Sequence, residues 1–150
     1  MSAGSRWQQA FLVASLVMTL QGISWVVIGS FDPFGWWDGR MAEALFSRSE
    51  LTAEEESVKR ALLAPLGATD AGFFLLALLF AWRAERTGER FVVRGLAAAV
   101  VLWYVVDSAG SVAAGIGFNA LWVNTPAALL LMGLLSGWWR ALGDSETDVV

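Results

Sequence analysis

Four long apolar runs alternate with shorter polar connections along the 150-residue chain. The runs cover about residues 7–28, 61–82, 91–114 and 118–139. Each has the roughly twenty residues that an α-helix needs to cross a bilayer core of about 30 Å. Apolar runs of this length are typical of membrane-spanning helices rather than of a soluble core. The pattern therefore predicts an all-α fold, an integral membrane bundle of four transmembrane helices.

The connections between the runs carry signals for where helices begin, bend and end. Thr52 and Glu55 have the spacing of a capping box, which would start the second helix ahead of its apolar part. Residues 115–117, Gly-Ile-Gly, predict a tight turn between the third and fourth helices. Pro65 predicts either a kink in the second helix near the membrane interface or the start of its buried part, and Pro126 predicts a kink in the fourth, because proline lacks the N–H that continues the helical ladder.

Two segments are expected to lie outside the bundle. The first, residues 31–60, would form an outer loop with a short surface helix. Its Phe34, Trp36 and Trp37 are either anchors at the membrane interface or part of a lid over an outward-facing pocket. The second, residues 141–150, is acidic and is expected to form a disordered tail.

Arginine side chains mark one side of the predicted bundle. They flank the first and fourth runs and fill the connection between the second and third, at Arg6, Arg83, Arg86, Arg90, Arg94 and Arg140. The opposite side carries four basic residues, at Arg40, Arg48, Lys59 and Arg60, so the bias is six to four. Basic residues accumulate on the cytoplasmic side of membrane proteins, and an even number of spans places both termini on the same side. Both termini are therefore expected in the cytoplasm. The preference for arginine over lysine indicates a bacterial source, and hence the inner membrane.

Composition excludes several classes of function. The chain has no cysteine and no histidine, which excludes disulfides, thiolate chemistry, histidine-bound metals and histidine-ligated haem. The formal net charge of −4 argues against nucleic-acid binding. No phosphate loop, nucleotide fingerprint or hydrolase motif is present. The sequence therefore offers no catalytic residue, metal site or cofactor site, and it favours a role other than that of an enzyme.

Four strong polar residues occupy the apolar runs at a similar depth. Asp70 and Asp107 lie equally far from the arginine-rich connection that joins their runs, and at about 1.5 Å rise per residue both lie roughly 20 Å above it. Gln21 and Asn124, counted from the arginines that flank their own runs, fall in nearly the same layer. A carboxylate in hydrocarbon costs at least ~2.5 kcal/mol, so such residues usually face the bundle interior and are often functional.

No cationic side chain lies in this layer, so Asp70 and Asp107 are expected to share a proton. Trp103 and Ser111 lie on the helical face of Asp107, and an aromatic ring beside a carboxylate can hold a cationic amine. The layer either only hydrogen-bonds neighbouring helices or forms a ligand pocket. The candidate ligand-binding residues are Gln21, Asp70, Trp103, Asp107, Ser111 and Asn124.

At the level of architecture, a four-span bundle with the buried carboxylates Asp70 and Asp107 resembles the small membrane proteins of the emopamil-binding and sigma-2 type. That resemblance implies acidic residues that meet an amine or sterol ligand. Isomerase activity is not implied, because the chain lacks the histidine that the catalytic members use. The stretches VLWYVVDSAGS (101–111) and FNALWVNTP (118–126) also resemble uncharacterised bacterial four-span membrane families.

The leading hypothesis is a small integral membrane protein whose polar pocket binds a small lipophilic or cationic molecule from the outer leaflet. One alternative is an accessory subunit of a larger membrane complex, in which the polar groups face partner subunits. The other is a proton-linked transporter or an oligomeric channel. The apolar stretches LLALLF (75–80) and LLLMGLLSG (129–137) argue against a continuous polar channel.

Single cysteines test the expected orientation, because the chain has no cysteine of its own. With the first connection outside and the arginine-rich connection inside, a membrane-impermeant maleimide applied to intact cells should label Ser49→Cys. It should leave Thr87→Cys unlabelled until the membrane is permeabilised. The reverse pattern would overturn the orientation.

Overall fold

The structure is a computed structural model that describes residues 3–29, 32, 34–87 and 90–147. These residues are almost entirely helical and include no strand, so the predicted all-α fold is confirmed. The elements in chain order are α1 (Ala3–Ile28), α2 (Trp36–Phe46), α3 (Ala53–Thr87), α4 (Arg90–Ala113), α5 (Gly117–Asn119), the π-helical segment η1 (Ala120–Asn124) and α6 (Thr125–Thr147). The last three follow one another without a break and form one long rod.

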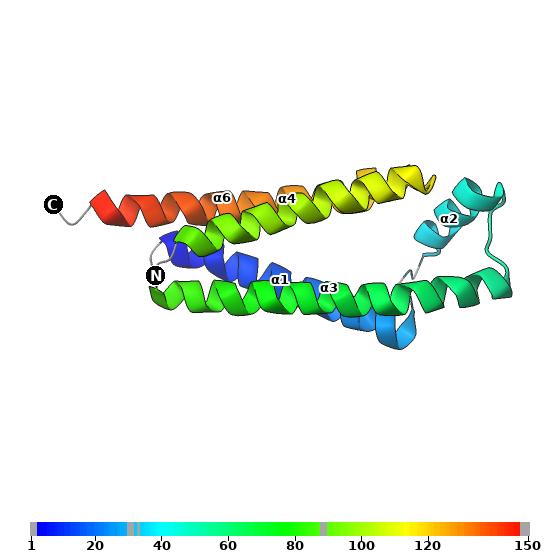
Figure 1. The fold of residues 1–150 in the computed structure, drawn as a ribbon, viewed down its shortest axis with the longest axis horizontal. Coiled ribbons are helices and arrows are strands. Elements are labelled where there is room, and N and C mark those ends of the chain that lie inside the picture. Colours follow the sequence, from blue (N-terminus) through cyan, green and yellow to red (C-terminus); the bar gives the residue numbers. More distant parts are fainter. Residues whose placement is uncertain (1–2, 30–31, 33, 88–89, 148–150) are drawn as a thin grey trace.

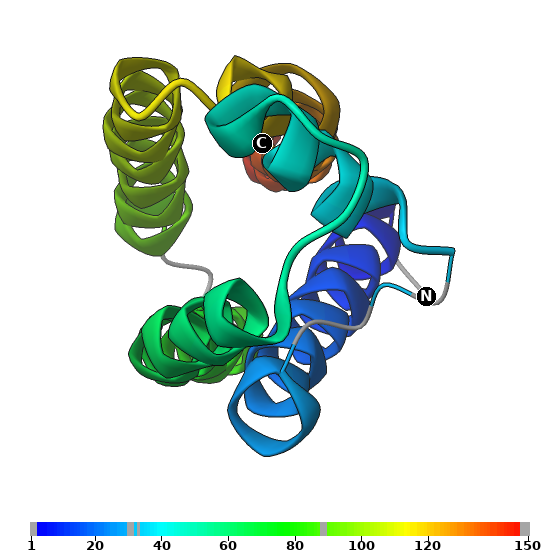
Figure 2. The ribbon, with the colours of Figure 1, turned by 90° about the vertical axis from the view of Figure 1, so that its right-hand side faces the viewer.

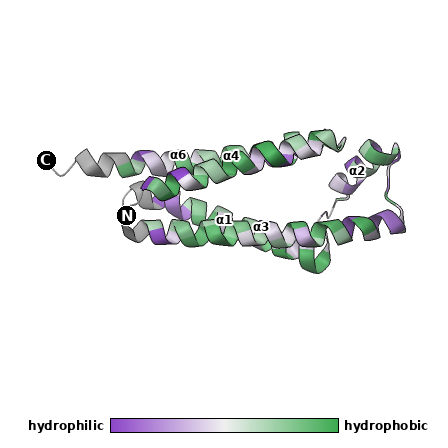
Figure 3. Ribbon diagram, in the orientation of Figure 1, coloured by the Kyte–Doolittle hydropathy of each residue, from purple (hydrophilic) through white to green (hydrophobic). Residues whose placement is uncertain are grey.

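Four segments of the described chain are long and apolar enough to cross a membrane. They are Arg6–Ile28, Ala53–Ala84, Arg90–Ala113 and Gly117–Leu142. Hydrophobic residues colour most of the length of these helices (Figure 3). Many of their large apolar side chains point outward and are exposed, as expected for surfaces that face lipid. The fold therefore indicates a multi-pass membrane protein.

The long helices form two pairs. α1 packs along α3, α4 packs along α6, and α1 also contacts α6 (Figures 1 and 2). Both chain ends and the α3–α4 connection lie at one end of the molecule, which we call the arginine end because α3, α4 and α6 carry Arg83, Arg94 and Arg140 there. The opposite end, where α2 lies, is called the α2 end.

Small residues allow α1 to approach α3 closely. A Cβ atom added to Gly22 would lie 2.6 Å from the Gly67 carbonyl oxygen, and one added to Gly67 would lie 2.5 Å from the Gly22 carbonyl oxygen. Small side chains at such crossings let backbones pack together in lipid. Nearer the arginine end, the buried Gln8 amide donates a hydrogen bond of 2.6 Å to the Ala81 carbonyl oxygen. These contacts fix the two helices as one unit.

The apolar core fills the half of the bundle near the arginine end. Gly137 of α6 lies directly against the ring of Trp7, and the rings of Phe11 and Trp138 lie 6.3 Å apart between their centroids. All four long helices contribute to this buried cluster, through Phe11, Phe74, Ala77, Ala81, Ala84, Val93, Leu96, Val100, Leu131, Leu135 and Trp138. The close-packed half of the molecule is therefore the half that holds both termini.

Two of the predicted local signals are confirmed at the helix ends. The Thr52 N–H donates to the Glu55 carboxylate at 2.8 Å, and the Glu55 N–H donates to the Thr52 hydroxyl at 3.3 Å, which is the reciprocal pattern of a capping box. α4 and α5 are joined by a tight turn in which Gly115 has a φ of +80°, a conformation that glycine adopts without strain. Pro65 lies inside α3, and the helix continues on both sides of it.

The predicted tail needs a correction. α6 continues to Thr147, so the segment after residue 140 is helical over most of its length rather than disordered. Ala141 and Leu142 are good helix formers, and no proline follows to end the helix. The last three residues, 148–150, lie outside the described part of the chain.

The glycine contact between α1 and α3 gives a test of the fold. Gly22→Ala and Gly67→Ala should each destabilise the protein by about 1–3 kcal/mol, because the new methyl group overlaps backbone atoms of the facing helix. Gly72→Ala is the matched control, since nothing lies within 4 Å of a Cβ there. Thermal unfolding in detergent, followed by circular dichroism, should show a lower melting temperature only for the first two variants. Equal melting temperatures in all three would contradict this packing.

Candidate functional site

Three of the predicted polar residues occupy core-facing positions on their helices. Asp70, Asp107 and Asn124 fall on the same helical faces as the buried apolar residues of α3, α4 and α6, at the spacing of three or four residues that keeps side chains on one face. On each helix, the polar residue lies within two turns of the buried residue that ends the core on the side of the α2 end. These residues are Phe74 on α3, Val100 on α4 and Ala128 on α6. A polar layer therefore begins where the close-packed half ends.

The strongest contact in this layer joins α4 to the rod that faces it. The Asn124 amide nitrogen donates to the Asp107 carboxylate at 2.5 Å and to the Ser108 hydroxyl at 3.3 Å. Asn124 is only 2% exposed, whereas Asp107 is half-buried. A hydrogen bond to a charged acceptor is roughly twice as strong as a neutral one. This bond satisfies one oxygen of a carboxylate that lipid would leave without a partner.

Two further hydrogen bonds run between the same helices. Toward the α2 end, the Asn119 amide donates to the hydroxyl of the buried Ser111 at 3.0 Å. Toward the core, the hydroxyl groups of Tyr104 and Thr125 lie 3.2 Å apart. Together with the Asp107–Asn124 bond, they form a line of polar contacts from the turn at residues 114–116 to the upper limit of the core. We call this line the α4–η1 polar ladder.

The π-helical segment η1 explains how both asparagines reach α4. Pro126 has no N–H, and its ring would clash with the carbonyl group four residues earlier in a regular helix. The wider π turn avoids this clash. The backbone N–H and the hydroxyl of Thr125 both donate to the Ala120 carbonyl oxygen, the hydroxyl at 2.8 Å. In a regular α-helix Asn119 and Asn124 would point about 140° apart, whereas here both hydrogen-bond to α4.

Helix α2 connects the two helix pairs at their open end (Figure 2). The indole N–H of Trp37 donates to the Asn119 side-chain oxygen at 3.5 Å, and the rings of Trp36 and Trp37 meet Phe118 edge-on with centroids 6.0 and 6.3 Å away. On its other side, α2 pairs with α3 through Asp38 and Lys59. The expected surface helix is thus present, and Trp37 belongs to the end of the polar ladder.

The ion pair between Asp38 and Lys59 is largely buried. The lysine nitrogen lies 2.6 Å from the Asp38 carboxylate, and the lysine side chain is 8% exposed. The start of α2 is held by Asp32, whose carboxylate accepts the backbone N–H groups of Trp36 and Asp38 at 3.1 and 2.9 Å. Separating a buried ion pair is costly, because it leaves each charge away from water without its partner. It therefore fixes α2 to α3 at the mouth of the bundle.

Asp70 faces the ladder from α3 and differs from Asp107 in its surroundings. It is half-buried, and within the described residues its carboxylate accepts no hydrogen bond and meets no basic side chain. Asp70 lies one turn beyond Phe74 and Asp107 two turns beyond Val100, and both of these apolar residues belong to the same buried cluster. The structure thus brings the two carboxylates of the predicted layer into the same region.

Gln21 and Trp103 are placed differently from the rest of the predicted set. The Gln21 side chain is exposed on α1 and makes no hydrogen bond to the described part of the ladder, so the structure does not bring it together with Asp107 or Asn124. The backbone carbonyl oxygen of Gln21 accepts a hydrogen bond from the Ser24 hydroxyl at 2.7 Å. Trp103 is half-buried on α4, one turn from Asp107, and the structure records no stacking partner for its ring.

Several ladder residues were not singled out from the sequence as site residues. Tyr104 and Thr125 are polar residues near Asp107 and Asn124, and this closeness is a usable signal. Asn119 and Trp37 could not be assigned in this way. Their contacts depend on the π turn and on the folding back of α2, and neither has a distinct sequence pattern.

Comparison of the chain with protein-family models, with curated proteins and with solved structures finds no match. The fold and the site define a multi-pass membrane protein with a polar layer in one half of its helical bundle. Its function has to be inferred from that layer.

A double-mutant cycle tests the Asp107–Asn124 contact. Asn124→Leu should destabilise the protein by about 1–3 kcal/mol, because it leaves the carboxylate without its donor. Adding Asp107→Leu should recover part of that loss, since removing both members of a buried polar pair costs little. Gln21→Leu is the control and should not destabilise, because that side chain is exposed. Unfolding of these variants and of the single variant Asp107→Leu in detergent gives the values that the cycle needs. Strict additivity of the two leucine substitutions would show that the contact carries no coupling energy.

Proposed function

We propose that the protein binds a small amphiphilic amine in the polar half of its bundle. The observation that carries this proposal is the position of Asp70 and Asp107, which face inward just beyond the core and have no basic partner among the described residues. Two carboxylates in a region of low dielectric constant attract a cation strongly, because little water screens them. A bound ammonium group would supply the charge that the protein lacks there.

The two carboxylates would play different parts. Asp107 is held by the Asn124 amide, so its position is fixed before any ligand arrives. Asp70 accepts no hydrogen bond from the described residues and is free to adjust to the ligand. An ammonium group between them would donate one N–H to each. Trp103 lies one turn from Asp107 and would offer its ring face to the same charge.

The apolar part of the ligand would lie against the upper limit of the core, at Phe74, Val100 and Leu131, which are buried there. Its length is limited because the core below is close-packed and offers little space. The preferred ligand therefore has a short apolar body and a single cationic head. A large sterol would need the helices to move apart.

Helix α2 would act as a lid over this region. Among the described residues, its polar and ring contacts to the bundle include the Trp36 and Trp37 contacts with α5 and the Asp38–Lys59 ion pair with α3. Opening would separate the ring contacts with α5, whereas the buried ion pair would keep α2 attached to α3. With the arginine end in the cytoplasm, as the positive-inside rule favours, this lid faces the outer leaflet of the bacterial inner membrane.

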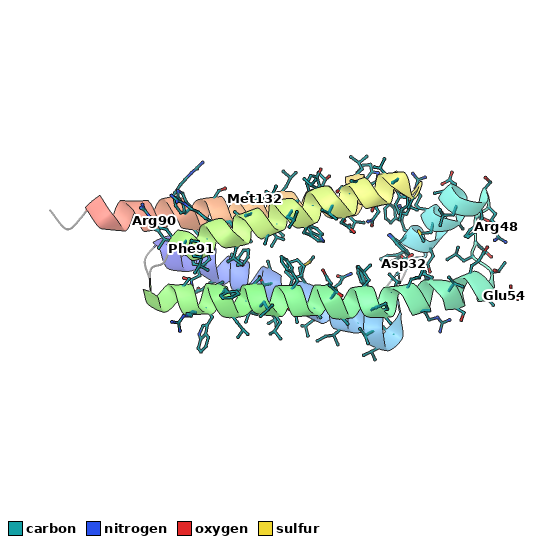
Figure 4. The ribbon with its side chains drawn as sticks, viewed as in Figure 1. Asp32, Arg48, Glu54, Arg90, Phe91 and Met132 are labelled. Atoms are coloured by element: carbon teal, nitrogen blue, oxygen red, sulfur yellow. The ribbon has the colours of Figure 1, made fainter. Side chains whose placement is uncertain are left out.

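A matched pair of amphiphiles tests the proposal. Decylamine, charged at pH 7.5, should raise the melting temperature of the detergent-purified protein by several degrees, and decanol at the same concentration should not. Ligand at a hundredfold excess over its Kd stabilises by about 2.7 kcal/mol. Asp70→Asn/Asp107→Asn should abolish the shift. Glu50→Gln/Glu54→Gln removes the same amount of charge from exposed sites at the α2 end, and this variant should keep the melting-temperature shift. Arg48 and Glu54 mark that end in Figure 4.

Two results would overturn the proposal. One is equal stabilisation by decylamine and decanol, which would indicate a general detergent effect. The other is an unchanged melting temperature together with a second membrane protein that co-purifies in stoichiometric amount. The second outcome favours an accessory subunit, a role that the exposed amide of Gln21 within a membrane span would suit, because a partner helix could bind it.

A further inference from the structure

A second candidate site lies at the arginine end, away from the polar ladder. An open groove of about 350 Å³ runs between α4 and α6. Its polar part is formed by Arg94, Ser136, Trp139 and Arg140, and Ala97 and Met132 line its apolar part. The groove thus offers two cations and a hydroxyl donor beside an apolar strip on the membrane-spanning surface. Met132 on α6 and Arg90 near the start of α4 locate it in Figure 4.

Trp139 contacts two arginine side chains of α4, of which Arg94 lines the groove. The guanidinium carbons of Arg94 and Arg90 lie 4.7 and 5.3 Å from the centroid of the Trp139 ring. Stacking on an aromatic face uses the flat side of the guanidinium group and leaves its N–H edge available for a planar or tetrahedral oxyanion. The ring contact therefore holds the Arg94 guanidinium beside the groove, while the side chain stays exposed and can receive an anion.

The two ends of the molecule differ in how their cations are neutralised. At the α2 end, Arg40, Arg48, Lys59 and Arg60 each form a salt bridge with a carboxylate. At the arginine end, the structure pairs none of Arg6, Arg83, Arg94 and Arg140 with a described carboxylate. Cationic side chains at a membrane surface attract anionic lipids, at about 1 kcal/mol per residue. Within the described part of the chain, these cations are therefore available to an external anion.

We propose that the α4–α6 groove binds an anionic phospholipid. Its phosphate would lie between Arg94 and Arg140 and accept a hydrogen bond from the Ser136 hydroxyl. One acyl chain would run along Ala97 and Met132 toward the middle of the bilayer. A free phosphate would use only the contacts with Arg94, Arg140 and Ser136. The apolar strip next to the two arginines is what favours a lipid, because a small inorganic anion would leave it uncovered.

Native mass spectrometry of the full-length protein tests this site. Protein purified in detergent and exchanged into micelles with equal amounts of phosphatidylglycerol and phosphatidylcholine should retain phosphatidylglycerol selectively. Arg94→Gln/Arg140→Gln should weaken that retention by roughly tenfold or more. Arg6→Gln/Arg83→Gln is the matched control, because it removes two exposed charges from the same end without touching the groove, and it should keep the selectivity.

A second variant separates the groove from charge alone. Ala97→Leu fills the apolar strip, leaves every arginine in place and should also reduce phosphatidylglycerol retention. Equal retention of the two lipids by the wild type would overturn the proposal. So would equal loss of selectivity in both arginine variants, which would indicate a diffuse charge effect. Displacement of the lipid by millimolar inorganic phosphate would show that the groove is a site for the free anion instead. None of these results depends on Asp70 or Asp107.

Discussion

A membrane supplies no hydrogen-bond partner at the depth of Asp107, so the protein has to supply one itself. It does so with the Asn124 amide on the facing helix. Much of the geometry of the polar half follows from this requirement. The amide must face α4, and the rod that carries it must lie close to α4 along its upper part. The two helices are then aligned lengthwise, and the Asn119–Ser111 and Tyr104–Thr125 contacts form on either side.

The bundle combines two kinds of packing that suit different roles. Near the arginine end, glycines, alanines and large aromatic rings fit together closely, and such packing has a single arrangement that resists change. Near the α2 end, helices are held by hydrogen bonds, one buried ion pair and a few ring contacts. Those contacts can be exchanged one at a time. A close-packed half beside a half held by a few separate contacts would suit the proposed uptake of a ligand at the α2 end.

Much of this organisation could be predicted from residue patterns. The apolar runs gave the four spanning helices, and the spacing of Thr52 and Glu55 gave the start of α3. Asp70, Asp107, Ser111 and Asn124 were expected in one layer, and Asp107 and Asn124 do contact one another, while Ser111 bonds to Asn119 of the same rod. The failures have physical causes. Depth along a helix follows from a constant rise, but the face that meets the other helices is decided by packing. α1 packs on α3 through Gly22, which leaves the neighbouring Gln21 exposed. The helical end of α6 runs through residues of low helix propensity, so local sequence did not predict it.

The π turn at Ala120–Asn124 behaves like an inserted residue within an otherwise regular helix. Each residue of an α-helix advances the side-chain direction by about 100°, so the register before the turn and the register after it are offset from one another. Phe118 and Asn119 follow the first register and contact α2, whereas Asn124 and the buried face of α6 follow the second. Shortening the chain by one residue here would remove the extra residue of the π turn and rotate one register away from its partners. The α2 contact and the carboxylate contact could thus be uncoupled by length alone, with the chemistry of every side chain in both contacts left intact.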